Sequence, residues 1–200
     1  MKHYGDITKI NGAEIEPVDV ITAGSPCQDL SVAGKRAGLE GERSGLFMEQ
    51  IRIIKEMREH DRRANHRTDE FIRPRYMVWE NVPGALSSNK GEDFRCVLEE
   101  TAKIVQEDAV IPGPENGKWS YSGCIMGDGW SIAWRIHDAQ FWGVPQRRKR
   151  IALVADFGGG SAPEILFVRK GLSRDTEPSF KEGEGTSADP EGCFGEPGEE

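Results

Sequence analysis

The pattern of apolar positions along the chain predicts alternating strands and helices. An apolar, β-branched run at residues 18–23 predicts a buried strand, and Gly24 begins the loop that follows it. Apolar residues at helical spacing predict a helix over 44–59, a second buried strand is expected at 75–82, and a second helix at 92–106. A strand, a helix and a strand in this order indicate a right-handed crossover and two parallel strands.

The pattern changes in the second half of the chain. Residues 108–129 are rich in Gly and Pro and are expected to be irregular. Alternation over 130–138 predicts a half-exposed strand, and the apolar run 150–156 predicts another. The short connection between them suits an antiparallel pair at the edge of the sheet. The predicted fold class is therefore α/β, a mostly parallel sheet with an antiparallel edge hairpin.

Charge separates the body of the chain from its last residues. Segment 171–200 holds nine acidic and two basic residues, a net −7 out of the −8 of the whole chain. The acidic balance therefore belongs to this segment and does not exclude a nucleic-acid partner for the body. We expect residues 1–157 to form a folded core and 158–200 to be an acidic Gly/Glu-rich linker or a disordered tail.

The cysteines do not indicate a metal site or a disulfide framework. No two of them have the close C-x-x-C spacing of a zinc site, so reduced thiols in a cytoplasm are the simplest account. No apolar run approaches the roughly 20 residues that span a bilayer. The four are Cys27, Cys96, Cys124 and Cys193.

The segment Pro26-Cys27-Gln28 is the first candidate for chemistry. Cys27 follows the end of the first predicted strand, where open α/β sheets hold their ligands. A thiol on a loop at such an edge can act as a nucleophile. The alternative for a cysteine seen alone is a small buried side chain.

Two further polar groups lie at predicted strand ends. Glu80 and Asn81 close an otherwise apolar strand, where burial raises the pKa of an unpaired carboxyl and suits it to donate a proton. Gln146, Arg148 and Arg150 open the last strand, and alternation would aim both guanidiniums at one face, where they could bind phosphate or a base oxygen. The alternatives are an ordinary solvent-facing acid and a solvated run of bases.

In this order, the three groups resemble the motifs of the DNA cytosine-5 methyltransferases. Tyr4-Gly5-Asp6-Ile7 is similar to the third motif of that family, and Arg43-Ser44-Gly45-Leu46-Phe47 to its fifth, so the resemblance covers about residues 3–157. It implies a partial Rossmann-like fold that depends on S-adenosylmethionine. It also implies double-stranded DNA with a flipped cytosine as the partner.

The resemblance implies a role for each matching residue. Cys27 would add to C6 of cytosine, Glu80 would hold N3 and the exocyclic amine, and Asn81 would fix the Pro-Cys loop while lying beside the substrate. Arg148 and Arg150 would position the target nucleotide and lower the cost of forming the thiolate. The resemblance adds Gln146 and Ser31 as substrate contacts, and Asp6, Ile7, Pro26 and Leu46 as cofactor contacts.

Some family features do not occur in these 200 residues. The Phe-x-Gly-x-Gly loop, the acidic residue for the ribose and a target-recognition domain are absent from the sequence. We therefore expect a truncated or split enzyme that binds S-adenosylmethionine poorly alone and is completed by a fragment carrying the other motifs. The recognised DNA sequence and the biological role, whether restriction-modification, phage or regulatory, stay open.

Three other readings remain. A transfer-RNA methyltransferase shares Pro-Cys-Gln and Glu-Asn-Val, although the continuation Ser31-Val32-Ala33-Gly34 is more similar to bacterial DNA enzymes. A remnant or half-enzyme could bind nucleic acid without catalysis. A cysteine hydrolase would need a histidine near Cys27, and no context suggests one. The histidines are His3, His60, His66 and His137.

Overall fold

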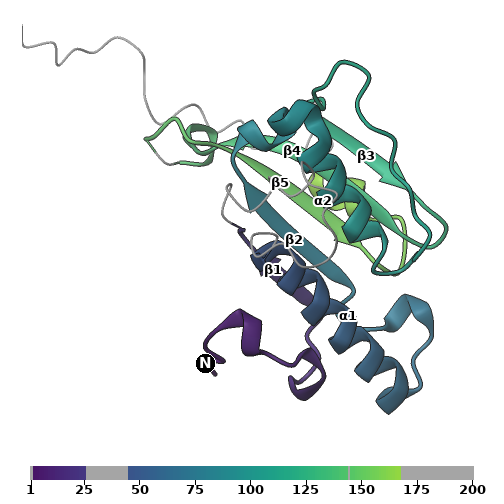
Figure 1. Cartoon of the computed structure of the whole chain (residues 1–200). Helices are drawn as coiled ribbons and strands as arrows, with labels where there is room; N and C mark the ends of the chain where they lie inside the picture. The colour runs from purple at the N-terminus through teal and green to yellow at the C-terminus, as the bar shows by residue number, and fades with distance from the viewer. Residues whose placement is uncertain (1, 26–44, 144, 168–200) are drawn as a thin grey trace, which may run out of the picture.

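A mixed five-stranded sheet in the order β1-β2-β5-β4-β3 organises the described part of the chain (Figure 1). The computed structural model describes residues 2–25, 45–143 and 145–167. The strands are β1 (Val20–Ala23), β2 (Tyr76–Asn81), β3 (Ser122–Met126), β4 (Ser131–Asp138) and β5 (Lys149–Asp156).

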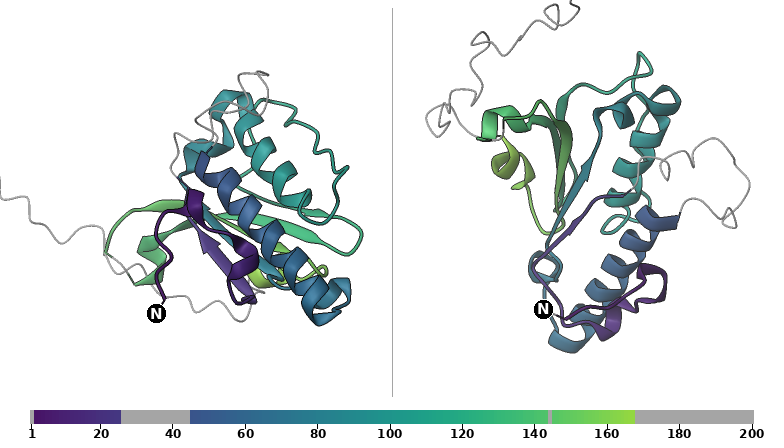
Figure 2. Two further views of the ribbon diagram at one scale, coloured as in Figure 1. Left: turned by 60° about the horizontal axis from the view of Figure 1, so that its bottom comes forward. Right: turned by 90° about the vertical axis from the view of Figure 1, so that its left-hand side faces the viewer.

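Helices cover the sheet unequally. The long helix α1 (Gly45–Asn65) and the helix α2 (Glu92–Ala102) lie on one face, and the short α3 (Ala162–Leu166) lies on the other (Figures 1 and 2). Between the sheet and the two long helices, Trp79 packs on Phe94 with ring centroids 6.2 Å apart, and Phe94 on Trp134 at 5.6 Å. These buried aromatic rings fix the sheet against its helices.

The structure confirms both early strands and both long helices, but α1 is longer than predicted. Its last turns are polar, so apolar spacing ends near residue 59. Asp61 is nevertheless fully buried, and it accepts hydrogen bonds from the backbone N–H (2.9 Å) and a guanidinium nitrogen (3.0 Å) of Arg73. Burial raises the pKa of Asp61, but the bonds from Arg73 outweigh it and the net pKa is lowered. A buried ion pair thus extends the helix.

The α/β class is confirmed, but the predicted predominance of parallel strands is wrong. Only β1 and β2 run parallel, whereas β5 is antiparallel to both β2 and β4, and β4 is antiparallel to β3. The predicted edge pair β4–β5 lies inside the sheet, because β5 is buried on both faces: Leu153 on the α2 side, Val154 on the α3 side. The central place of β5 depends on its pairing with β2, far back in the sequence, so residues 149–156 alone give no signal of it.

The edge strand β3 lies in the segment that was predicted to be irregular. Its first three residues are Ser, Gly and Cys, and none of the five is fully buried, so the strand shows no clear alternation of apolar and polar residues. The indole of Trp134 packs against Gly123 so closely that a side chain there would collide with the ring. β3 therefore forms around a large residue of the neighbouring strand.

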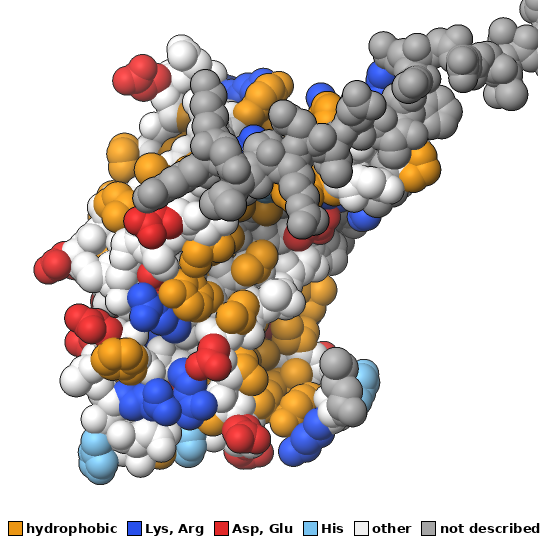
Figure 3. Space-filling view, turned by 180° about the vertical axis from the view of Figure 1, so that it is seen from behind, with side chains coloured by type: hydrophobic (Ala, Val, Ile, Leu, Met, Phe, Trp, Pro, Cys, Tyr) orange, Lys and Arg blue, Asp and Glu red, His pale blue; other side chains and the backbone are white. Residues whose placement is uncertain are grey.

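Packing continues beyond residue 157, the predicted end of the core. Ala162 and Leu166 of α3 pack on Ala133 and Val154, on the face shown in Figure 3, where hydrophobic side chains gather in the middle. The buried Asp156 accepts bonds from Arg75 Nε (3.0 Å) and from the backbone N–H groups that follow β5. The folded part thus reaches at least residue 167, and the acidic tail at 168–200 stays a prediction outside the described residues. None of the described helices is long and apolar enough to cross a membrane.

Candidate active site

The parallel pairing of β1 and β2 brings two of the predicted motifs together. Ala23 is the register partner of Trp79, so Gly24 and Ser25 leave β1 beside Glu80 and Asn81 at the end of β2. The carboxyl ends of parallel strands share one edge of a sheet, which is where α/β proteins place ligands. The pairing thus joins the Pro-Cys-Gln segment to Glu-Asn-Val through the residue before Pro26.

Ser25 is held by β2 at two atoms. The buried Asn81 donates from Nδ2 to the carbonyl oxygen of Ser25 (3.0 Å), and its Oδ1 accepts the backbone N–H of Val82 (2.7 Å). The indole N–H of Trp79 donates to Ser25 Oγ (3.0 Å). Trp79 was not expected in the site from the sequence, because its spacing is that of a core residue and its N–H partner is distant in sequence.

Three of the predicted site residues, and the motif residue Gln28, cannot be placed against these contacts. Pro26, Cys27 and Ser31, together with Gln28, lie outside the described residues. Their roles remain predictions, and the structure contributes the position of the residues that lead into them.

Glu80 lies on the sheet face opposite to Trp79 and Asn81. Its Oε1 pairs with Arg150 Nε of β5 at 2.9 Å, and the side chain is half exposed. The expectation of a buried carboxyl does not hold, because burial alternates along β2 and Glu80 lies on its more exposed side. A Cβ on Gly24 would lie 3.3 Å from Glu80 Oε2, so glycine leaves room for the carboxylate beside the end of β1.

The other residues of the basic motif lie on the connection between β4 and β5. Gln146 and Arg148 are exposed, and β5 begins one residue after Arg148. The backbone N–H of Arg148 donates to Asp138 Oδ1 (3.0 Å), which ties this connection to the end of β4. The structure therefore brings Arg150 to Glu80, and places Arg148 in solvent on the adjoining segment.

Three of the predicted cofactor contacts, Asp6, Ile7 and Leu46, lie on α1 or on the turn that α1 anchors. Asp6 caps the turn Ile7–Lys9, with Oδ1 accepting the Thr8 N–H at 3.0 Å. Arg52 of α1 donates to the carbonyl oxygens of Ile7 (3.2 Å) and Ile10 (2.8 Å). Leu46 lies in the first turn of the same helix with 38% of its surface exposed. Arg52 is the anchor that sequence reasoning missed, because its spacing to Glu49 and Glu56 indicated only an ion pair within the helix.

Loss of the Asn81 amide should slow chemistry without weakening DNA binding. Asn81→Ala and Asn81→Asp both remove the donor to the Ser25 carbonyl, and misplacing a reacting group by about 1 Å costs on the order of 100-fold in rate. We expect that loss in the rate of covalent trapping on a 5-fluorocytosine duplex, measured with S-adenosylmethionine and a separate segment that supplies a Phe-x-Gly-x-Gly loop, with the DNA dissociation constant unchanged. An equal rate in Asn81→Asp and the unmodified protein, with both folded by circular dichroism, would show that the Ser25 contact has no such role.

The comparison with protein families now decides the identity. The family model described as C-5 cytosine-specific DNA methylase matches residues 1–104, which is more than half of the chain and includes both the Pro-Cys-Gln and Glu-Asn-Val segments. The chain belongs to the C-5 cytosine-specific DNA methylase family. The family resemblance read from the motifs is thereby confirmed, while the Gln146–Arg150 segment lies beyond the matched region.

The proteins that this chain resembles carry different names. The chain is 37% identical over 211 residues to the DNA N-6-adenine-methyltransferase of Escherichia phage P1, covering 93% of this chain and 27% of that protein. It is 32% identical over 153 residues to the Type II methyltransferase M.BsuFI of Bacillus subtilis, covering 76% and 28%. The structure of the Dnmt2 methyltransferase of S. pombe matches with a TM-score of 0.44 and 18% identity, over 87% of this chain and 43% of that one. The chain spans just over a quarter of the length of the two curated relatives.

Proposed function

We propose that this chain carries the catalytic residues for transfer of a methyl group from S-adenosylmethionine to C5 of cytosine in double-stranded DNA. The observation that supports it most is the joining of the two motifs: Asn81 and Trp79 hold Ser25, immediately before Pro26-Cys27, while Glu80 lies beside Gly24. A nucleophile on the first strand end and a carboxyl on the second could then act on one flipped base.

Each residue has a defined task in this proposal. The Cys27 thiolate forms a bond to C6, and the electron pair of the C5–C6 double bond becomes available at C5. Glu80 holds N3 and the exocyclic amine, which stabilises the charge that develops as sulfur adds. When bound, S-adenosylmethionine supplies the methyl group, which leaves its sulfonium for C5. Removal of the C5 proton by a base then expels Cys27 and restores the double bond.

The described residues fit part of a cofactor site. Leu46 offers an exposed apolar surface, and Asp6 keeps a carboxylate at the neighbouring turn, both anchored on α1. We propose that Asp6 meets the adenine and that Ile7, Pro26 and Leu46 pack against the cofactor. The 200 residues hold no Phe-x-Gly-x-Gly loop, so we propose that they bind S-adenosylmethionine weakly alone and that a segment with that loop completes the site.

Product analysis tests this function. The chain would be combined with a separate segment that supplies a Phe-x-Gly-x-Gly loop, incubated with methyl-labelled S-adenosylmethionine and duplex DNA, and the modified base identified. We expect 5-methylcytosine, and titration of the chain alone should give no micromolar affinity for the cofactor. Label found in RNA rather than in matched DNA would support the RNA alternative and contradict the proposed substrate.

The name of the phage P1 relative supports a second candidate, methylation of adenine at N6. An exocyclic nitrogen carries its own lone pair and needs no thiol to activate it, so this reaction would not use Cys27. Labelled N6-methyladenine that persists in Cys27→Ser would identify the second function and overturn the first. Because the chain covers only 27% of that relative, its name describes a protein with much additional sequence.

A further inference from the structure

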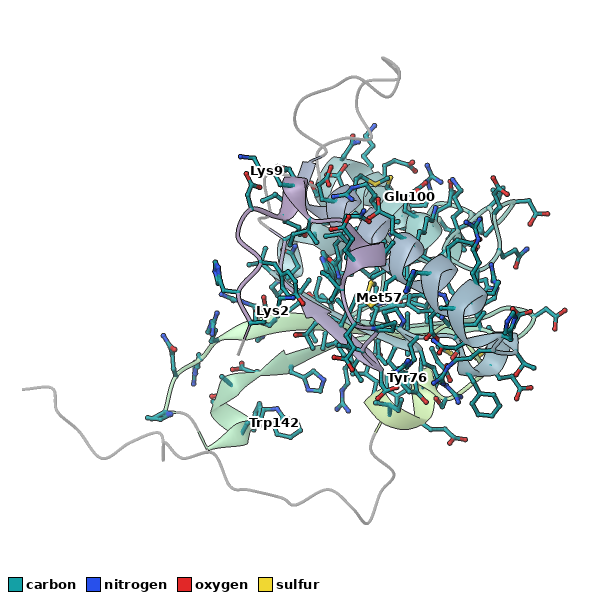
Figure 4. All side chains as sticks on the ribbon, turned by 90° about the horizontal axis from the view of Figure 1, so that it is seen from below. Lys2, Lys9, Met57, Tyr76, Glu100 and Trp142 are labelled. Atoms are coloured by element: carbon teal, nitrogen blue, oxygen red, sulfur yellow. The ribbon has the colours of Figure 1, made fainter. Side chains whose placement is uncertain are left out.

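One tryptophan of the chain differs from the others in its exposure. Trp142 ends the turn Ala139–Trp142, which joins β4 to β5, and it is 63% exposed. Trp79, Trp130 and Trp134 are each exposed by 5% or less, and Trp119 is partly buried. Figure 4 shows Trp142 on a segment that projects from the body of the sheet. A large ring in this position contributes little to the hydrophobic core.

Local contacts hold this ring in place. The His137 ring meets Trp142 edge to face, with centroids 5.5 Å apart. The nearly buried Asp138 caps the turn by accepting the backbone N–H of Gln140 (3.3 Å), and it also accepts the N–H of Arg148 (3.0 Å). Trp142 is thus presented to solvent by a turn that is tied to both flanking strands.

The surroundings of Trp142 are basic. Arg135, two residues before His137 on the same face of β4, and Arg148 are both exposed, and among the described contacts neither guanidinium has an ion pair. The nearby carboxylates are engaged: Asp138 with backbone N–H groups and Glu80 with Arg150. The segment therefore combines an open aromatic face with excess positive charge.

Trp142 is also connected to the candidate active site. His137 and Arg150 are register partners on β4 and β5, and Arg150 pairs with Glu80. The indole thus packs on the residue opposite Arg150, and the Arg150 guanidinium meets the carboxylate that would hold cytosine.

We propose that Trp142 is a stacking platform for a DNA base next to the target cytosine, with Arg135 and Arg148 binding the adjacent phosphates. This inference rests on the proposed function for the choice of DNA. Aromatic side chains interleaved with bases bind strands in this way, since every base has a π-face and the cations neutralise phosphate. A protein partner over Trp142 would instead have to desolvate two guanidiniums.

Fluorescence anisotropy with a labelled cytosine-containing duplex tests the inference on the full chain. Losing one stacked base weakens binding by about 5-fold to 100-fold, so Trp142→Ala should show a loss in this range while Trp142→Phe binds nearly normally. The salt slope should stay unchanged in Trp142→Ala and fall by about one in Arg148→Ala. DNA should also quench the tryptophan emission, and Trp142→Phe should remove most of that quenching.

A matched control separates stacking from general effects. Phe71 is exposed by 58% and comes before the first residue of β2, at the other end of that strand from Glu80. Phe71→Ala should therefore bind DNA normally. Repeating the Trp142→Ala measurement in a Cys27→Ser background keeps the inference separate from catalysis, since binding needs no thiol. Equal DNA affinity of Trp142→Ala and the unmodified chain, no DNA binding by the chain, or loss of self-association instead of DNA binding would each overturn it.

Discussion

Replacing Cys27 with serine should abolish covalent trapping of the chain on a 5-fluorocytosine duplex. The assay contains S-adenosylmethionine and the added segment with the Gly-rich loop. A hydroxyl is a far weaker nucleophile than a thiolate at neutral pH, and removal of a covalent nucleophile lowers rates by at least about 10³-fold. The same variant should form no detectable 5-methylcytosine. DNA affinity should be retained, because the serine hydroxyl is no larger than the cysteine thiol that it replaces.

The structural reason to expect this concerns the residues before the thiol. Ser25 is bonded to β2 through its carbonyl and its hydroxyl, so the segment that contains Cys27 starts from a fixed point beside Glu80. The control is Cys124→Ser, since Cys124 is a free, exposed thiol on the edge strand β3. Trapping that survives in Cys27→Ser but disappears in Cys124→Ser would show that Cys124 is the nucleophile and that the prediction for Cys27 is wrong.

Glu80→Gln should reduce the trapping rate by about 10²-fold to 10⁴-fold, the range expected for a group that transfers a proton in the transition state. The amide keeps the shape of the side chain but can neither hold the negative charge that Arg150 pairs with nor pass a proton to N3. DNA affinity should be equal or slightly better, because one negative charge near phosphate is removed.

A second glutamate on the surface provides the comparison for Glu80. Glu59 of α1 pairs with Arg62 at 3.0 Å and is exposed by 42%, against 50% for Glu80. Glu59→Gln should therefore leave both trapping and DNA binding unchanged. If the two glutamine variants trapped DNA at the same rate, Glu80 would be an ordinary surface ion pair and the proposed role would fail.

Local patterns predicted much of the first half of the fold. β1, β2 and the start of α1 were expected from apolar runs and helical spacing, since these patterns record which side chains face a core. The motifs also led to the family, because each one is a short run of chemically defined residues that can be recognised without knowing the fold.

Other elements depended on partners outside their own segments. The length of α1 follows from Asp61 binding Arg73, and β3 forms where Trp134 requires a glycine opposite it. A polar or small residue has no periodic signal, so neither element could be predicted from its own segment.

The candidate site shows the same division between sequence and structure. The sequence by itself determined which chemical groups are available: the thiol of Cys27, the carboxyl of Glu80 and the bases around Arg150. Only the tertiary structure decided that Asn81 binds Ser25, that Arg150 meets Glu80, and that Trp142 stays exposed beside them. The physical reason is that the site lies where β2 meets β1 and β5, in contacts between segments more than 50 residues apart. Such contacts leave no pattern in either segment alone.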